Sequence, residues 1–132
     1  MNLDKKSLSA IEKIISCINE LKILTKDKNA EYFYDRFDLI ALLNLLDTIK
    51  LNLNKISSKI KEKYNNINWD IIKKRNSENI GVAWELVSKT LKTELLDDLN
   101  KILEIELPTY YSNLCNKMHE DFIKQKMKKI TK

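Results

Sequence analysis

The sequence predicts an all-α protein, an antiparallel bundle of four to five helices. Large apolar residues recur along most of the 132 residues at steps of three and four, the spacing that places them on one face of a helix. One Gly and one Pro are too few for the turns of an all-β fold or for a Gly-rich phosphate-binding loop. A hydrophobic fraction of 43% at this length is enough for one domain with its own core, which excludes general disorder.

The first helix is expected over residues 8–24, with Asp4 or Ser7 as a candidate cap at its start. A second helix is expected from residue 30 to about residue 63. The middle of this second helix is apolar nearly all round, so we expect it at the centre of the bundle.

Three further helices complete the predicted bundle. A short one begins near Asn68 or Trp69, and a longer one spans residues 77 or 78 to 104. Pro108 is expected to stop that helix or to open the last one, because proline cannot donate a backbone hydrogen bond. The last helix is expected to turn its apolar residues toward the body: Tyr111, Leu114, Met118, Ile123 and Met127.

We assign residues 1–116 to a single helical bundle domain and residues 117–132 to a basic C-terminal helix end or tail. The tail has six Lys against two acids, which accounts for most of the formal net charge of +5. Clustered lysines attract phosphates and carboxylates, although a solvated helix end is the alternative interpretation. The candidate contacts to a partner or a nucleic acid are Lys124, Lys126, Lys128 and Lys129.

No cofactor and no metal site is predicted, because one His and two distant Cys cannot complete a four-ligand zinc site. Cys17 and Cys115 are expected to be buried or half-buried free thiols, as in a reducing cytoplasm. No apolar run is long enough for a membrane span, and the start lacks the apolar core of a signal peptide. We therefore expect a cytoplasmic protein without membrane contact.

Two tryptophan-containing segments suggest a family. WDIIKKRN at residues 69–76 follows the long helix and a polar turn, and VAWELV lies at residues 82–87. We assign Trp69 and Trp84 as anchors to the core. Together with the amphipathic first helix and residues 33–38, these segments resemble the HepT-like toxin branch of the HEPN-domain superfamily. The resemblance covers about residues 8–104 and implies a small all-helical protein of a prokaryotic toxin–antitoxin system.

In that family an Arg–Asn pair is followed by a His about five residues after the Arg, and the Arg and His cleave RNA without a metal at a dimer interface. The resemblance assigns Arg75 and Asn76 to this pair, with the arginine stabilising phosphate charge. The His has no counterpart, because residues 80–82 are Ile, Gly and Val. Losing an acid–base group typically costs ~10²–10⁴ in rate, so the resemblance implies the fold better than the activity.

Three functions follow as hypotheses. The first is a non-catalytic HEPN-like binding protein of a toxin–antitoxin or phage-defence system, which acts through protein–protein contacts. Its expected partners are a second copy in a homodimer, a nucleotidyltransferase-type antitoxin or a defence-system effector protein. The second is a metal-independent ribonuclease toxin with a rearranged site at Arg75 and Asn76, with RNA as its substrate. The third is a phage-encoded inhibitor or immunity protein with an unrelated helical fold.

The homodimer is expected from the amount of apolar surface. The apolar second helix and the aromatic residues Tyr32, Phe33 and Tyr34 exceed what one small bundle easily covers.

Overall fold

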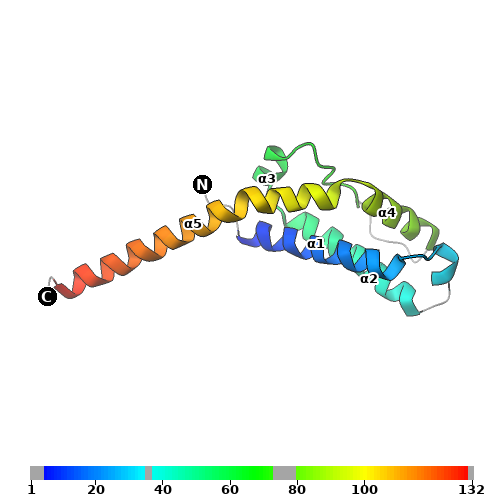
Figure 1. Ribbon diagram of the computed structural model, residues 1–132, viewed down its shortest axis with the longest axis horizontal. Helices are drawn as coiled ribbons and strands as arrows, with labels where there is room; N and C mark the ends of the chain where they lie inside the picture. Colours follow the sequence, from blue (N-terminus) through cyan, green and yellow to red (C-terminus); the bar gives the residue numbers. More distant parts are fainter. Residues whose placement is uncertain (1–4, 35–36, 73–79, 131–132) are drawn as a thin grey trace.

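The computed structural model describes residues 5–34, 37–72 and 80–130. Those ranges are all-α and contain no strand, so the predicted fold class, an all-α helical bundle, is confirmed (Figure 1). The elements in chain order are α1 (Lys5–Thr25), the 3-10 helix η1 (Ala30–Phe33), α2 (Phe37–Lys55), α3 (Ser58–Lys63), α4 (Ile80–Lys92) and α5 (Leu95–Ile130). Each helix in the described ranges is too short or too polar to cross a bilayer.

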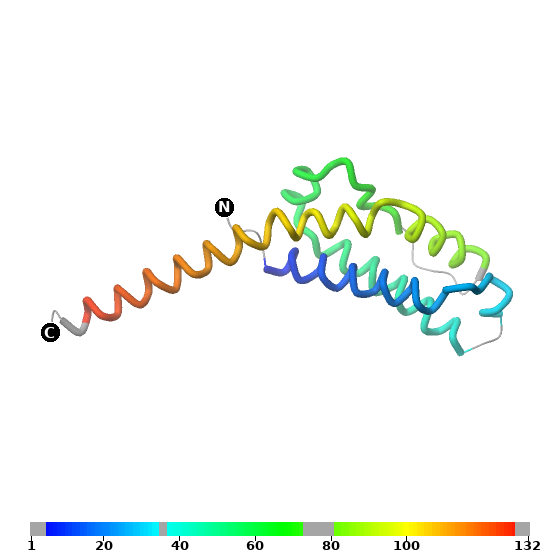
Figure 2. Tube along the Cα trace, in the orientation of Figure 1, coloured from blue at the N-terminus to red at the C-terminus, as the bar shows by residue number. Residues whose placement is uncertain are grey.

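The body of the molecule is built on the antiparallel pair α1 and α2, which make the most extensive contact between elements (Figure 2). The first part of α5 packs against α1, and α4 contacts α1, α2 and η1. The core is formed by the apolar stripes of these helices, because residues three and four apart share a face. Its fully buried members include Ile11, Ile14, Ile18, Leu21, Leu42, Leu46, Ile49, Leu99 and Ile102.

The single helix predicted over residues 30–63 is wrong, since the structure divides it into η1, α2 and α3. Asn29 caps η1 by accepting a hydrogen bond from the backbone N–H of Tyr32 at 3.1 Å. Ser57 caps α3 by accepting one from the backbone N–H of Ile60 at 3.4 Å. Such side chains satisfy the first N–H groups of a helix and so favour a new start over a continuous helix.

The central position predicted for the second helix is also wrong. One face of α2 packs in the core, whereas Ile40 and Leu51 on the same helix are each more than half exposed. The apolar run in the sequence therefore corresponds to a helix, α2, that buries one stripe of residues and leaves several apolar residues facing solvent.

The predicted ends of the later helices differ from the structure as well. The helix expected up to residue 104 is broken at Thr93 and Glu94, between α4 and α5. Pro108 neither stops nor opens a helix, because it lies inside α5. Burial of Ile102 and Glu106 fixes the preceding turns, and the helix continues past the missing N–H. Turns occupy residues 64–72 where a short helix was expected, and residues 73–79 lie outside the described chain.

The second half of α5 leaves the body and projects past the start of α1 (Figure 1). The buried residues of α5 end at Glu106, and residues 111–128 are all exposed. We call residues 111–128 the arm. The prediction that Tyr111, Leu114 and Met118 turn toward the body is therefore wrong, as it is for Ile123 and Met127, because the body ends where the arm begins.

Candidate functional site

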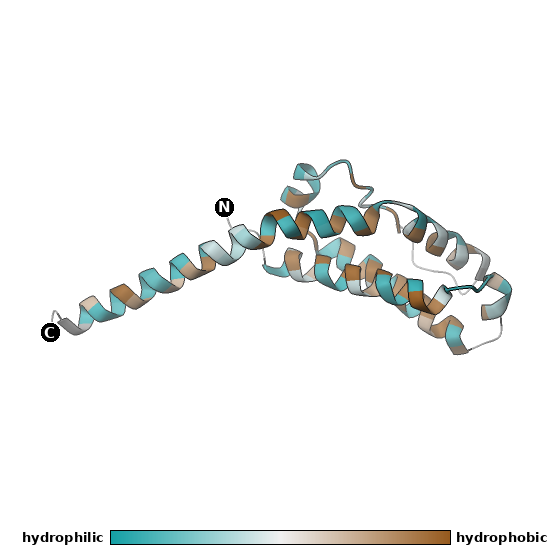
Figure 3. Ribbon diagram, viewed as in Figure 1, coloured by the Kyte–Doolittle hydropathy of each residue, from teal (hydrophilic) through white to brown (hydrophobic). Residues whose placement is uncertain are grey.

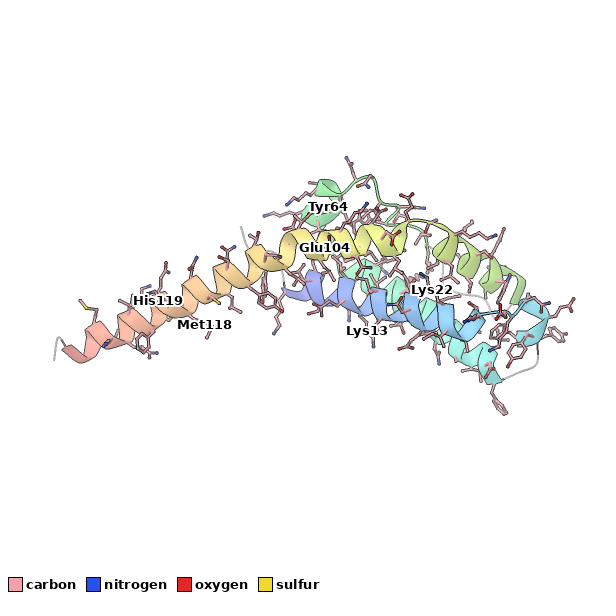
Figure 4. The ribbon with its side chains drawn as sticks, in the orientation of Figure 1. Lys13, Lys22, Tyr64, Glu104, Met118 and His119 are labelled. Carbon is pink, nitrogen blue, oxygen red and sulfur yellow. The ribbon has the colours of Figure 1, made fainter. Side chains whose placement is uncertain are left out.

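Of the residues predicted for catalysis and for charged contacts, the structure describes the lysines, which lie on α5. Arg75 and Asn76 lie outside the described residues. The single His119 is exposed on the arm, next to Met118 (Figure 4). Lys124, Lys126 and Lys128 are exposed near the end of the same helix, and Lys129 follows in it.

The two tryptophans lie at the edge of the core and are partly buried. The indole N–H of Trp69 donates a hydrogen bond to the backbone carbonyl of Tyr64 at 3.1 Å. The ring of Trp84 lies 5.5 Å from the ring of the fully buried Phe33. Trp69 thus holds the turns that follow α3, and Trp84 holds η1 against α4.

A partly buried charged cluster, in which Glu106 is the buried member, joins α3 to α5 and was not predicted from the sequence. Oε1 of Glu106 accepts hydrogen bonds from the ammonium group of Lys63, at 2.6 Å, and from the hydroxyl of Tyr64. Tyr64 lies over this part of α5 in Figure 4. The spacing of residues in the sequence indicates this buried glutamate. Residues 99, 102 and 106 share one helix face, so the carboxylate of residue 106 lies on the same side as two core leucine and isoleucine side chains.

The surroundings of Glu106 keep it ionised. Burial alone raises the pKa of its carboxyl, but the hydrogen bonds from Lys63 and Tyr64 and the charge of Lys63 outweigh burial and hold that pKa below its ordinary value. Burial, together with the hydrogen bond and charge of Glu106, raises the pKa of Tyr64. A carboxylate satisfied in this way is an anchor between two helices and not a proton donor.

The two cysteines differ in exposure. Cys17 is buried in α1, and burial raises the pKa of its thiol. Cys115 is exposed on the arm, so the expectation that both thiols are at least half-buried is wrong for it. In the described residues no three His, Cys, Asp or Glu side chains come together to hold a metal.

A pocket of about 290 Å³ lies between the turns after α3 and the start of α5. Its walls carry the carboxylates of Glu94 and Asp98 and the amides of Asn66 and Asn68. Acidic residues in the first turn of a helix stabilise the partial positive charge at its N-terminus. Asp98 lies in the first turn of α5, so its position is explained without a ligand in the pocket.

Exposed apolar residues gather at the end of the bundle opposite the arm. Ile23 lies near the end of α1, Tyr34 follows η1, and Phe37 and Ile40 begin α2. Phe37 is 89% exposed and Ile23 is 76% exposed. We call these four residues the tip.

The arm carries a second set of exposed apolar residues, visible as recurring hydrophobic positions along the projecting helix (Figure 3). At about 100° per residue, Tyr111, Leu114, Met118 and Phe122 share one face of the arm, whereas Ile123 and Met127 lie toward its opposite side. Its large apolar members are Tyr111, Leu114, Met118, Phe122, Ile123 and Met127.

The tip and the arm are two of the exposed apolar surfaces among the described residues. Comparison of the chain with family models, with curated proteins and with solved structures finds no match.

Proposed function

We propose that this chain is a helical binding protein of a prokaryotic toxin–antitoxin or phage-defence system, and that it acts through protein–protein contacts made by the tip. The observation that carries the proposal is the exposure of Phe37, an aromatic side chain left almost wholly in solvent. Three more large apolar side chains lie at the same end of the bundle. Exposed apolar patches with aromatic residues are typical of surfaces that bind other proteins.

The local fold supports a binding role because it uses the neighbouring aromatic residues internally. Phe33 is fully buried against Trp84, and the hydroxyl of Tyr32 donates a hydrogen bond to Asp38 at 3.1 Å. These contacts fix η1 and the start of α2 while Tyr34 and Phe37 remain outward. A contact surface held on a fixed scaffold loses little conformational entropy when it binds.

The system to which the protein belongs is proposed from the sequence. The segments at residues 69–76 and 82–87 resemble HepT-like HEPN proteins, and the missing His favours binding over RNA cleavage. We therefore propose a partner protein with an apolar pocket for Phe37, either a nucleotidyltransferase-type antitoxin or a defence-system effector.

Photo-crosslinking in the native host tests the tip as the binding surface. A photoreactive phenylalanine analogue at position 37 is expected to give one discrete protein adduct, whereas the same analogue at Lys13, exposed in the middle of α1, gives none. The identified protein, once purified, should bind the Phe37→Ser variant at least about tenfold more weakly than the wild type. Equal adducts at both positions, or an adduct with RNA at position 37, would contradict the proposal.

A further inference from the structure

Three side chains with sulfur or nitrogen donors gather on one turn of the arm. Cys115 and His119 are exposed there, and Met118 between them is 63% exposed (Figure 4). The whole chain has one His, two Cys and three Met. Residues 115–119 therefore bring together the His, one Cys and one Met of a chain in which all three residue types are scarce.

The geometry of a helix places these three side chains on one side. At about 100° per residue, Met118 lies about 60° to one side of Cys115, and His119 lies about 40° to the other side. Residues three and four apart on a helix have Cβ atoms about 5–6 Å apart. Because the three side chains are exposed, they can turn so that the thiol, the thioether and one imidazole nitrogen meet at one point above the turn.

The chemistry of the donors favours one class of metal ion. Thiolate and thioether sulfur are soft ligands that select Cu(I), and imidazole also suits copper. Zinc takes thiolate, imidazole and carboxylate ligands, so the thioether of Met118 adds nothing to a zinc site. The neighbouring carboxylates of Glu120 and Asp121 lie about 140° and about 120° around the axis from Cys115, away from the three donors.

The charges also balance for a monovalent ion. When the Cu–S bond forms, the thiol of Cys115 loses its proton to solvent, because the thiolate is the metal ligand. The single negative charge of the thiolate then neutralises the single positive charge of Cu(I). The thioether and the neutral imidazole complete a three-coordinate site with two sulfur atoms and one nitrogen.

The arm is a place where such an ion changes the stability of a helix. Residues 111–128 are all exposed, and a helix in water draws most of its stability from packing of an apolar face. An ion that binds residues i, i+3 and i+4 closes across one turn. Because the three donors meet only when this turn is helical, the free energy of binding stabilises the helix.

We propose that Cys115, Met118 and His119 form a binding site for one Cu(I) ion, which clamps one turn of the arm. The site lies on α5 and not at the tip, so it does not depend on the function proposed above.

Competition with the chelator bicinchoninate tests the site, with the full chain in oxygen-free buffer. The wild type is expected to take one Cu(I) ion per chain. Met118→Leu and His119→Asn should each weaken binding at least about tenfold, and Cys115→Ser about a hundredfold. The matched control is Met127→Leu, which removes another exposed thioether of the arm, about 120° around the axis from Cys115, and should bind like the wild type.

Two results of this titration overturn the proposal. Loss of binding in Cys115→Ser, with Met118→Leu and His119→Asn equal to the wild type, means that the exposed thiol alone captures the ion. One ion for every two chains means that the donors come from different molecules.

Two further measurements test the ligand set and the clamp. X-ray absorption at the copper edge should show two sulfur ligands and one nitrogen, and a single sulfur ligand overturns the site. Amide hydrogen exchange should slow at least about tenfold at residues 115–123 when Cu(I) is added, and stay unchanged in the middle of α1. Unchanged exchange in the arm overturns the clamp.

Discussion

The side-chain hydroxyl of Ser7 accepts a hydrogen bond from the backbone N–H of Ser57 at 2.9 Å, across a separation of 50 residues. Ser7 is fully buried near the start of α1, and Ser57 is the cap residue of α3. This bond attaches the short helix α3 to α1. It also supplies a partner for a backbone N–H that would otherwise be partly buried without one.

We predict that Ser7→Ala lowers the free energy of unfolding by about 1–3 kcal/mol, because it leaves the Ser57 N–H without its acceptor. Urea denaturation measures the change. Ser9→Ala removes the same hydroxyl from an exposed position two residues along α1 and should change stability by no more than about 0.5 kcal/mol. Equal effects of the two substitutions would show that the Ser7–Ser57 bond does not stabilise the fold.

A second prediction concerns the anchor between α3 and α5. Glu106→Gln keeps an acceptor for Tyr64 but removes the charge that holds Lys63, so it should cost about 1–2 kcal/mol of unfolding free energy. Lys63 is 58% exposed, and solvent screening limits the contribution of the ion pair itself. The matched control is Glu104→Gln, an exposed glutamate of the same helix, with an expected change within about 0.5 kcal/mol. A larger loss for Glu104→Gln would contradict the assignment.

The lowered pKa of Glu106 predicts a pH dependence with a definite sign. A carboxyl whose folded pKa is below its unfolded value contributes all of its stabilisation above the unfolded pKa, about 4.3 for Glu. That contribution is lost as the pH falls through the lower folded value. The difference in unfolding free energy between wild type and Glu106→Gln should therefore be constant above about pH 5 and shrink below about pH 4.3. Chemical denaturation at a series of pH values measures it, and a difference that grows toward acid would refute the assignment.

The helical class was predictable because the spacing of apolar residues is a local property of the chain. The errors in helix length have local physical causes too: Asn29 and Ser57 offer caps that compete with a continuous helix, and Pro108 is tolerated because tertiary packing holds the turns before it. Periodicity cannot say which helix face meets the body. Tyr111 and Met118 have the same spacing as core residues, yet they are exposed because none of the other described helices covers them.

The candidate surfaces were harder to predict than the fold. The sequence does not distinguish Phe33 from Phe37, and the packing of Phe33 against Trp84 shows which of the two aromatic rings is buried. The partners of Glu106 come from α3, more than 40 residues away, so they depend on how the helices pack. The predicted pair Arg75–Asn76 lies outside the described residues and stays a prediction.

The last prediction concerns the turns after α3, which Trp69 fixes. The carbonyl of Tyr64 accepts hydrogen bonds from the indole N–H of Trp69 at 3.1 Å and from the backbone N–H of Ile67 at 3.2 Å. Trp69→Phe keeps an aromatic ring at the edge of the core but removes the indole donor, so it should lower the unfolding free energy by about 1 kcal/mol. Amide hydrogen exchange should accelerate at residues 67–71 and stay unchanged in the middle of α1. Unchanged stability together with unchanged exchange at Ile67 would mean that packing of the ring alone, without its hydrogen bond, holds this segment.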